Sequence, residues 1–184
     1  MRPFVDTALT PSHVTTLRLA TGIAAAVAFA IGDRVWDITG GWLFVVSAFL
    51  DRADGELARL SGKTSTFGHR YDLAADATCS VIAFAGIGIG LSHGPLADSA
   101  LLMGLISAVA IAGIFWLAQR MERAGEPLSG AAGFDPDDAL FIVGPAAWFD
   151  ALAPLLFAAA LCAPLFLIFA LWRMRKDRRN QVSR

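Results

Sequence analysis

DRADGELARLSGKTSTFGHRYDLAAD, residues 51 to 76, stands between two apolar stretches and limits how they can be arranged. Two pairs of aspartates bracket it: Asp51 and Asp54 are three residues apart, and Asp72 and Asp76 are four apart. On helices the members of each pair lie on one face, about one turn from each other. Because one pair ends an apolar stretch and the other opens the next, the short link predicts an antiparallel hairpin in which the four carboxylates converge.

The composition shows which solvent the apolar stretches face. Of the 184 residues, 56% are hydrophobic and only 17% are charged, and the mean hydropathy is +0.58. A single domain of this size, residues 1–184, has too little interior to bury so much apolar surface, which indicates a membrane protein. The net charge of −1 gives no basic excess for a nucleic-acid partner. Cys79 and Cys162 lie in apolar stretches and are expected to be buried thiols.

Six apolar stretches predict an all-α bundle of six transmembrane helices, since about 20 helical residues cross a bilayer core. The second continues as a polar helix past Asp51, and the fifth is short, so it either begins upstream near Phe134 or leans inside the bundle. The stretches are Val14–Ile31, Val35–Leu50, Tyr71–Leu91, Ala100–Ala118, Asp138–Phe149 and Ala151–Trp172.

The lysines and arginines predict the orientation. With six spans, 14 of the 15 basic residues fall on the side that holds both termini, and only Arg34 falls on the other. Basic residues collect on the cytoplasmic side, so both termini and the Asp51–Asp76 segment are expected there, in a multi-pass protein of the cell's inner (plasma) membrane. The 14 are Arg2, Arg18, Arg52, Arg59, Lys63, Arg70, Arg120, Arg123, Arg173, Arg175, Lys176, Arg178, Arg179 and Arg184.

The four aspartates predict a metal site. Converging anions at a membrane edge repel one another and lose hydration, and a bound divalent cation removes both costs. Ligation by oxygen alone suits Mg²⁺ or Mn²⁺ better than zinc. For any single aspartate, a loop charge at the membrane boundary remains an alternative. Gly55 would let a nucleotide approach the backbone and Arg59 could meet a diphosphate, although membrane helices also contain ordinary glycines and snorkelling arginines.

The spacing D-x2-D-G-x2-A-R-x8-G-x3-D-x3-D resembles the signature of the CDP-alcohol phosphotransferase (CDP-alcohol phosphatidyltransferase) family. The chain matches all its fixed positions, which are Asp51, Asp54, Gly55, Ala58, Arg59, Gly68, Asp72 and Asp76. Residues 10–18, TPSHVTTLR, resemble the first span of that family, where P-N-x2-T is usual. Here Ser12 replaces the asparagine and Thr15 matches.

The resemblance implies roles for these residues. Asp51, Asp54 and Asp72 would hold the cations that grip the diphosphate of the donor, and Asp76 would lie near the metal and act as the catalytic base. The donor site would include the residues Thr15, Gly55, Ala58, Arg59, Ser65 and Gly68. A homodimer is implied as well.

The expected reaction follows from the same resemblance. A phosphatidyl or other phospho-alcohol group moves from a CDP-alcohol, by default CDP-diacylglycerol, to an acceptor hydroxyl in phospholipid biosynthesis, and CMP is released. The acidic segment GFDPDDA, residues 133–139, and the lack of basic residues within later spans favour an acceptor without phosphate. A solvated turn with an aspartate at a helix N-cap also explains the segment.

Two other functions would also use part of this pattern. A divalent-cation transporter or membrane metal-binding protein would use the four aspartates equally well. It has no need for Gly55, Ala58 and Arg59 at their spacing, which separates it from the transferase. An inactive scaffold is disfavoured because no aspartate of the set is missing.

Overall fold

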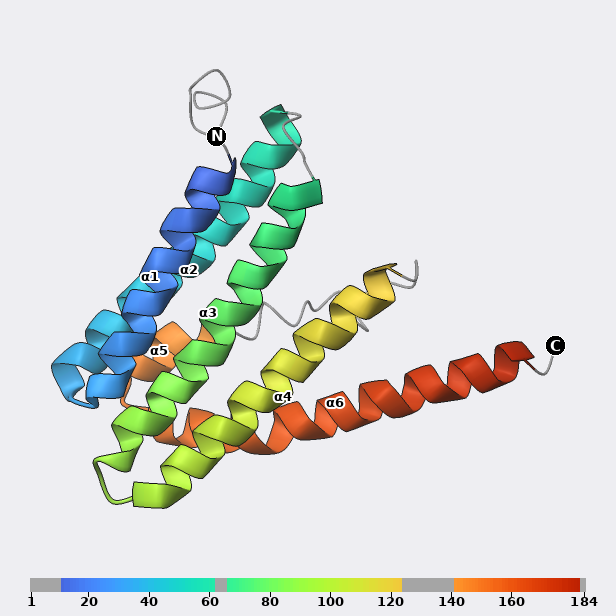
Figure 1. Ribbon diagram of the computed structural model, residues 1–184. Coiled ribbons are helices and arrows are strands. Elements are labelled where there is room, and N and C mark those ends of the chain that lie inside the picture. The colour runs from blue at the N-terminus through green and yellow to red at the C-terminus, as the bar shows by residue number, and fades with distance from the viewer. Residues whose placement is uncertain (1–10, 62–65, 124–140, 183–184) are drawn as a thin grey trace.

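The computed structural model describes residues 11–61, 66–123 and 141–182, and within these ranges every regular element is helical (Figure 1). This confirms the all-α prediction. The helices are α1 (Pro11–Ile31), α2 (Arg34–Ser61), α3 (Thr66–Ser92), α4 (Ala97–Arg123), α5 (Val143–Trp148) and α6 (Leu152–Val182).

Four helices are long and apolar enough to cross a bilayer: α1, α3, α4 and α6. Helix α2 has 28 residues, enough to span, but its second half is rich in charged side chains. Helix α5 has only 6 residues, about 9 Å of helix, against a bilayer core of about 30 Å. Four of the six predicted spans therefore meet both criteria. The suggested upstream start of the fifth span, near Phe134, lies outside the described residues.

Helix α1 packs against both α2 and α3 (Figure 1). On the other side, α3 packs against α4, and α4 packs against α6. The short α5 packs against α2. Small residues allow the closest approaches, as is usual between membrane helices. A Cβ added to Gly86 or Gly90 of α3 would collide with the backbone of α1, at the carbonyl oxygens of Ala26 and Phe29. The two helices are therefore in backbone contact along this part of α3.

The outer surface of the bundle is apolar. Only 11% of the most apolar part of α6 is buried, and large side chains such as Leu165 and Phe169 point outward. Such a surface suits lipid. Cys79 is buried in α3 as predicted, but Cys162 is exposed on α6, so the prediction for Cys162 is wrong. It faces outward because α6 contacts little except α4.

The aspartate-bearing ends of α2 and α3 lie together, as predicted, although the two helices make few direct contacts and α1 packs against both of them. The start of α1, the end of α2 and the start of α3 lie at one end of the bundle (Figure 1). Asp51 and Asp54 belong to the last part of α2, and Asp72 and Asp76 to the first part of α3. Helix α1 packs against both and forms the third wall of this site.

Candidate metal centre

Three of the four predicted metal ligands lie close together. One carboxylate oxygen from each of Asp51, Asp54 and Asp72 is within 4.8 Å of the others. Asp54 is buried, and the other two are partly exposed. The convergence predicted from their spacing is therefore present for these three. Asp76, one turn further along α3, is not a member of this group.

The carboxylates of this triad suit a hard divalent cation. Oδ1 of Asp54 is buried and has no hydrogen-bond partner among the described residues, and an unsatisfied buried carboxylate oxygen is costly unless a cation binds it. The other oxygen, Oδ2, accepts a 2.8 Å hydrogen bond from Oγ1 of Thr15. Burial, followed by the charge of Asp72, raises the pKa of Asp54 to about 6, against the lowering effect of Thr15. A cation would favour the ionised form.

Arg18 of α1 provides positive charge inside the site. Its side chain is only 3% exposed, and it pairs with Asp51 at 2.5 Å, Asp72 at 2.9 Å and Asp76 at 2.5 Å. From the sequence, Arg18 is one of the basic residues that set the orientation, and its place in the site is not predicted. Its position inside an apolar helix, one turn after Thr15, is the feature that could have predicted a role in the site, because an ionisable residue inside a span needs a buried partner.

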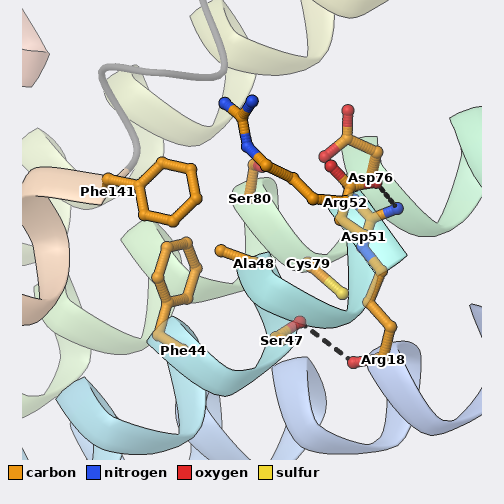
Figure 2. A pocket seen from close by; sticks show the side chains of 10 residues that line it. All are labelled: Arg18, Phe44, Ser47, Ala48, Asp51, Arg52, Asp76, Cys79, Ser80 and Phe141. Atoms are coloured by element: carbon orange, nitrogen blue, oxygen red, sulfur yellow. Dashed lines mark hydrogen bonds and ion pairs between the residues drawn. The ribbon is translucent and has the colours of Figure 1, made fainter. Parts of the chain in front are cut away.

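Asp76 borders a small cavity of about 30 Å³ between α2, α3 and Phe141 (Figure 2). Apolar rings and short polar side chains line most of it, and Arg52 stands at its edge with its guanidinium 5.2 Å from the ring centre of Phe141. The lining residues are Arg18, Phe44, Ser47, Ala48, Asp51, Arg52, Asp76, Cys79, Ser80 and Phe141. Asp76, the motif aspartate outside the metal triad, thus faces a partly apolar space, and Asp51 of the triad borders the same space.

The remaining predicted residues are placed unevenly. A Cβ on Gly55 would meet no atom within 4 Å, so space is open beside the ligand Asp54. Thr15 is 3% exposed and turned toward Asp54. Gly68 is in the first turn of α3, and Ala58 and Arg59 lie in the last part of α2, where only their backbone is described. Ser65 lies outside the described residues.

A family model described as CDP-alcohol phosphatidyltransferase matches residues 8–174. The match covers most of the chain, and the chain belongs to this family. The family suggested by the aspartate motif, and its class of transferase, are confirmed.

The chain is also similar to individual proteins. It is 33% identical over 82 residues to archaetidylinositol phosphate synthase of Pyrococcus horikoshii, a match that spans 45% of this chain and only 42% of that relative. Its fold is similar to that of phosphatidylinositol phosphate synthase of Mycobacterium tuberculosis. The apo structure shares 24% identity, with a TM-score of 0.69 over 93% of both chains. The structure with CDP-DAG bound shares 22%, with a TM-score of 0.71 over 93% of this chain and 90% of that one.

The prediction that the cofactor is a divalent cation, Mg²⁺ or Mn²⁺, is confirmed. The family uses divalent cations, and the acidic triad of this chain can hold one. A related structure of the mycobacterial synthase, 22% identical with a TM-score of 0.71, contains manganese and citrate.

Proposed function

We propose that this protein transfers a phosphatidyl or similar phospho-alcohol group from a CDP-alcohol to an acceptor hydroxyl and releases CMP. CDP-diacylglycerol is the proposed donor. The observation that carries the proposal is the arrangement of the aspartates: three converge as a ligand set, and the fourth, outside that set, borders a cavity that Asp51 of the set also lines. Membership of the transferase family argues against a cation transporter.

Asp51, Asp54 and Asp72 are the proposed ligands of Mg²⁺ or Mn²⁺. When bound, the cation neutralises charge on the donor diphosphate and on the leaving phosphate. The open space beside Gly55 lets the nucleotide approach α2 at this point. Ala58, Arg59, Ser65 and Gly68 are proposed to complete the donor site.

Asp76 is the proposed base, and we also propose that it lies close enough to the cation to act as a further ligand. Its carboxylate takes the proton of the acceptor hydroxyl, whose oxygen then forms a bond to the β-phosphorus of the donor. The bond from that phosphorus to the oxygen of CMP breaks, and CMP leaves with the electron pair. The cavity beside Asp76 holds the hydroxyl end of the acceptor and limits water near the base.

Several broader features belong to the same proposal. The whole chain, residues 1–184, acts as one domain with six spans in the cell's inner (plasma) membrane and works as a homodimer. Both termini and the aspartates face the cytoplasm, where a soluble acceptor and Mg²⁺ are available. The charge asymmetry of the sequence supports this orientation.

Purified protein with CDP-diacylglycerol, Mg²⁺ and a panel of acceptors tests the reaction through CMP release. The panel contains inositol phosphate, to which the names of the relatives point, and unphosphorylated alcohols, which the acidic segment at residues 133–139 favours. Absence of CMP release with every acceptor would reject the proposed transfer from CDP-diacylglycerol.

Two variants separate binding from chemistry. Asp76→Asn keeps the triad and should bind the CDP-alcohol with metal in calorimetry, while its turnover falls by roughly two to four orders of magnitude. Asp54→Asn removes a ligand and should lose binding and turnover together. Normal turnover by Asp76→Asn would disprove the base assignment, and loss of binding equal to that of Asp54→Asn would make Asp76 chiefly a ligand.

A further inference from the structure

Arg18 contacts three of the four motif aspartates. It is 3% exposed and reaches from α1 to Asp51 on α2 and to Asp72 and Asp76 on α3. Burying an arginine costs hydration energy, which ion pairs with its partners must offset. Neutralising one carboxylate would take only one such pair, whereas Arg18 makes three. The number and placement of these contacts therefore require a more specific explanation.

The two ends of the guanidinium contact different groups. Nη1 pairs with Asp51 and Asp72, two members of the metal triad, whereas Nη2 donates to Oδ1 of Asp76 at 2.5 Å. Because the guanidinium is planar and its nitrogens are fixed relative to one another, these contacts fix Asp76 relative to the triad. Asp54, the remaining carboxylate, is held by Thr15. Every aspartate of the set is thus held from α1.

Arg18 is itself held in place. Oγ of Ser47 on α2 donates a 3.0 Å hydrogen bond to the backbone carbonyl of Arg18 (Figure 2). That bond ties the α1 backbone to α2 at the level of the site, while Ser47 and Arg18 both line the cavity beside Asp76. The position of the guanidinium is therefore set at its backbone and at its tip.

We propose that Arg18 is a positioning residue for the transfer reaction: it holds Asp76 apart from the metal triad and directs its carboxylate toward the acceptor. This inference rests on the proposed function and adds a residue from α1 to the machinery. A contact that orients the base acts mainly in the transition state, so its loss lowers kcat more than it raises KM. The Mn²⁺ affinity should not fall in parallel with kcat, because removing the positive charge of Arg18 does not weaken the attraction between the carboxylates and Mn²⁺.

The experiment compares Arg18→Gln and Arg18→Lys with Arg120→Gln, a control that changes an exposed arginine of α4 beside Trp116. For each protein, Mn²⁺ affinity is measured by calorimetry without substrate, and kcat and KM for the donor are measured by CMP release. Arg18→Gln should keep its Mn²⁺ affinity within about threefold and lose roughly a hundredfold in kcat, on the scale of a positioned base. Arg18→Lys keeps the charge but not the fork, and should lose about tenfold.

The outcomes separate this inference from the proposed function. If the wild type releases no CMP, the proposed function fails. If it does, full turnover by Arg18→Lys would show that charge alone suffices and would overturn the positioning role. Loss of Mn²⁺ binding in step with turnover, in either variant, would make Arg18 a support for the metal ligands and would overturn it as well. Should Arg18→Gln fail to fold, Arg18→Lys alone decides by the same criteria.

Discussion

Replacing Thr15 by valine tests how the triad is held. Valine keeps the shape of threonine and removes only the hydroxyl that donates to Oδ2 of Asp54 at 2.8 Å. Oδ1 of Asp54 already lacks a hydrogen-bond partner among the described residues. In the variant, Oδ2 loses the hydrogen bond from residue 15 as well. A hydrogen bond to a charged group contributes about 1.5–3 kcal/mol, and each 1.4 kcal/mol is tenfold in an equilibrium constant.

Because this hydrogen bond favours the ionised form of Asp54, which is the form that binds a cation, its loss lets a proton compete with Mn²⁺. The apparent Kd for Mn²⁺ should therefore rise between about tenfold and about a hundredfold in Thr15→Val. Calorimetry on purified protein in detergent measures it directly, without substrate. Thr15→Ser, which keeps the hydroxyl, should restore most of the affinity. Thr21→Val is the matched control, because Thr21 of α1 donates only to carbonyls of its own helix. A Thr15→Val protein that bound Mn²⁺ as tightly as the wild type would show that this hydrogen bond does not prepare Asp54 for the cation.

Three further predictions address the cofactor, the topology and the packing. Chelator should abolish CMP release and added Mg²⁺ or Mn²⁺ should restore it, so full turnover in chelator would contradict the metal mechanism. Reporters fused at Lys63 and at the C-terminus should read cytoplasmic and one at Asp98 external, and an external reading at Lys63 would reverse the orientation. Gly90→Ala should lower the free energy of unfolding by about 1–3 kcal/mol in thermal denaturation, since its Cβ collides with Phe29, whereas Gly94→Ala, with its nearest contact at 3.5 Å, should not.

Much of the site could be predicted because its residues lie in one short segment. Helical spacing places Asp51 beside Asp54, and the short stretch of sequence between the two pairs keeps Asp72 near them, so local geometry is enough. The structure has these three together. The number of spans was harder to predict, because hydropathy cannot tell a short helix resting on α2, such as α5, from part of a crossing helix.

The contribution of α1 could not be obtained from local spacing. Arg18 is 33 residues from Asp51 and 58 from Asp76 in the chain, and nothing in the pattern around it names its partners. Its pairing depends on how α1 packs against α2 and α3, which small residues such as Gly86 decide. The same packing turns Thr15 toward Asp54. From sequence, Thr15 was expected to contact the donor, and that expectation stays a prediction.

The backbone contact of α3 with α1 at Gly86 makes that point a pivot for the metal ligands. Gly86 is 14 residues from Asp72, which is about 21 Å along the helix at 1.5 Å per residue. A rotation of about 3° at the pivot would thus carry Asp72 about 1 Å sideways, several times the roughly 0.2 Å that metal–ligand distances tolerate. Substitutions near Gly86, far from the motif aspartates, should therefore alter the cation affinity, because a small rotation of α3 displaces Asp72.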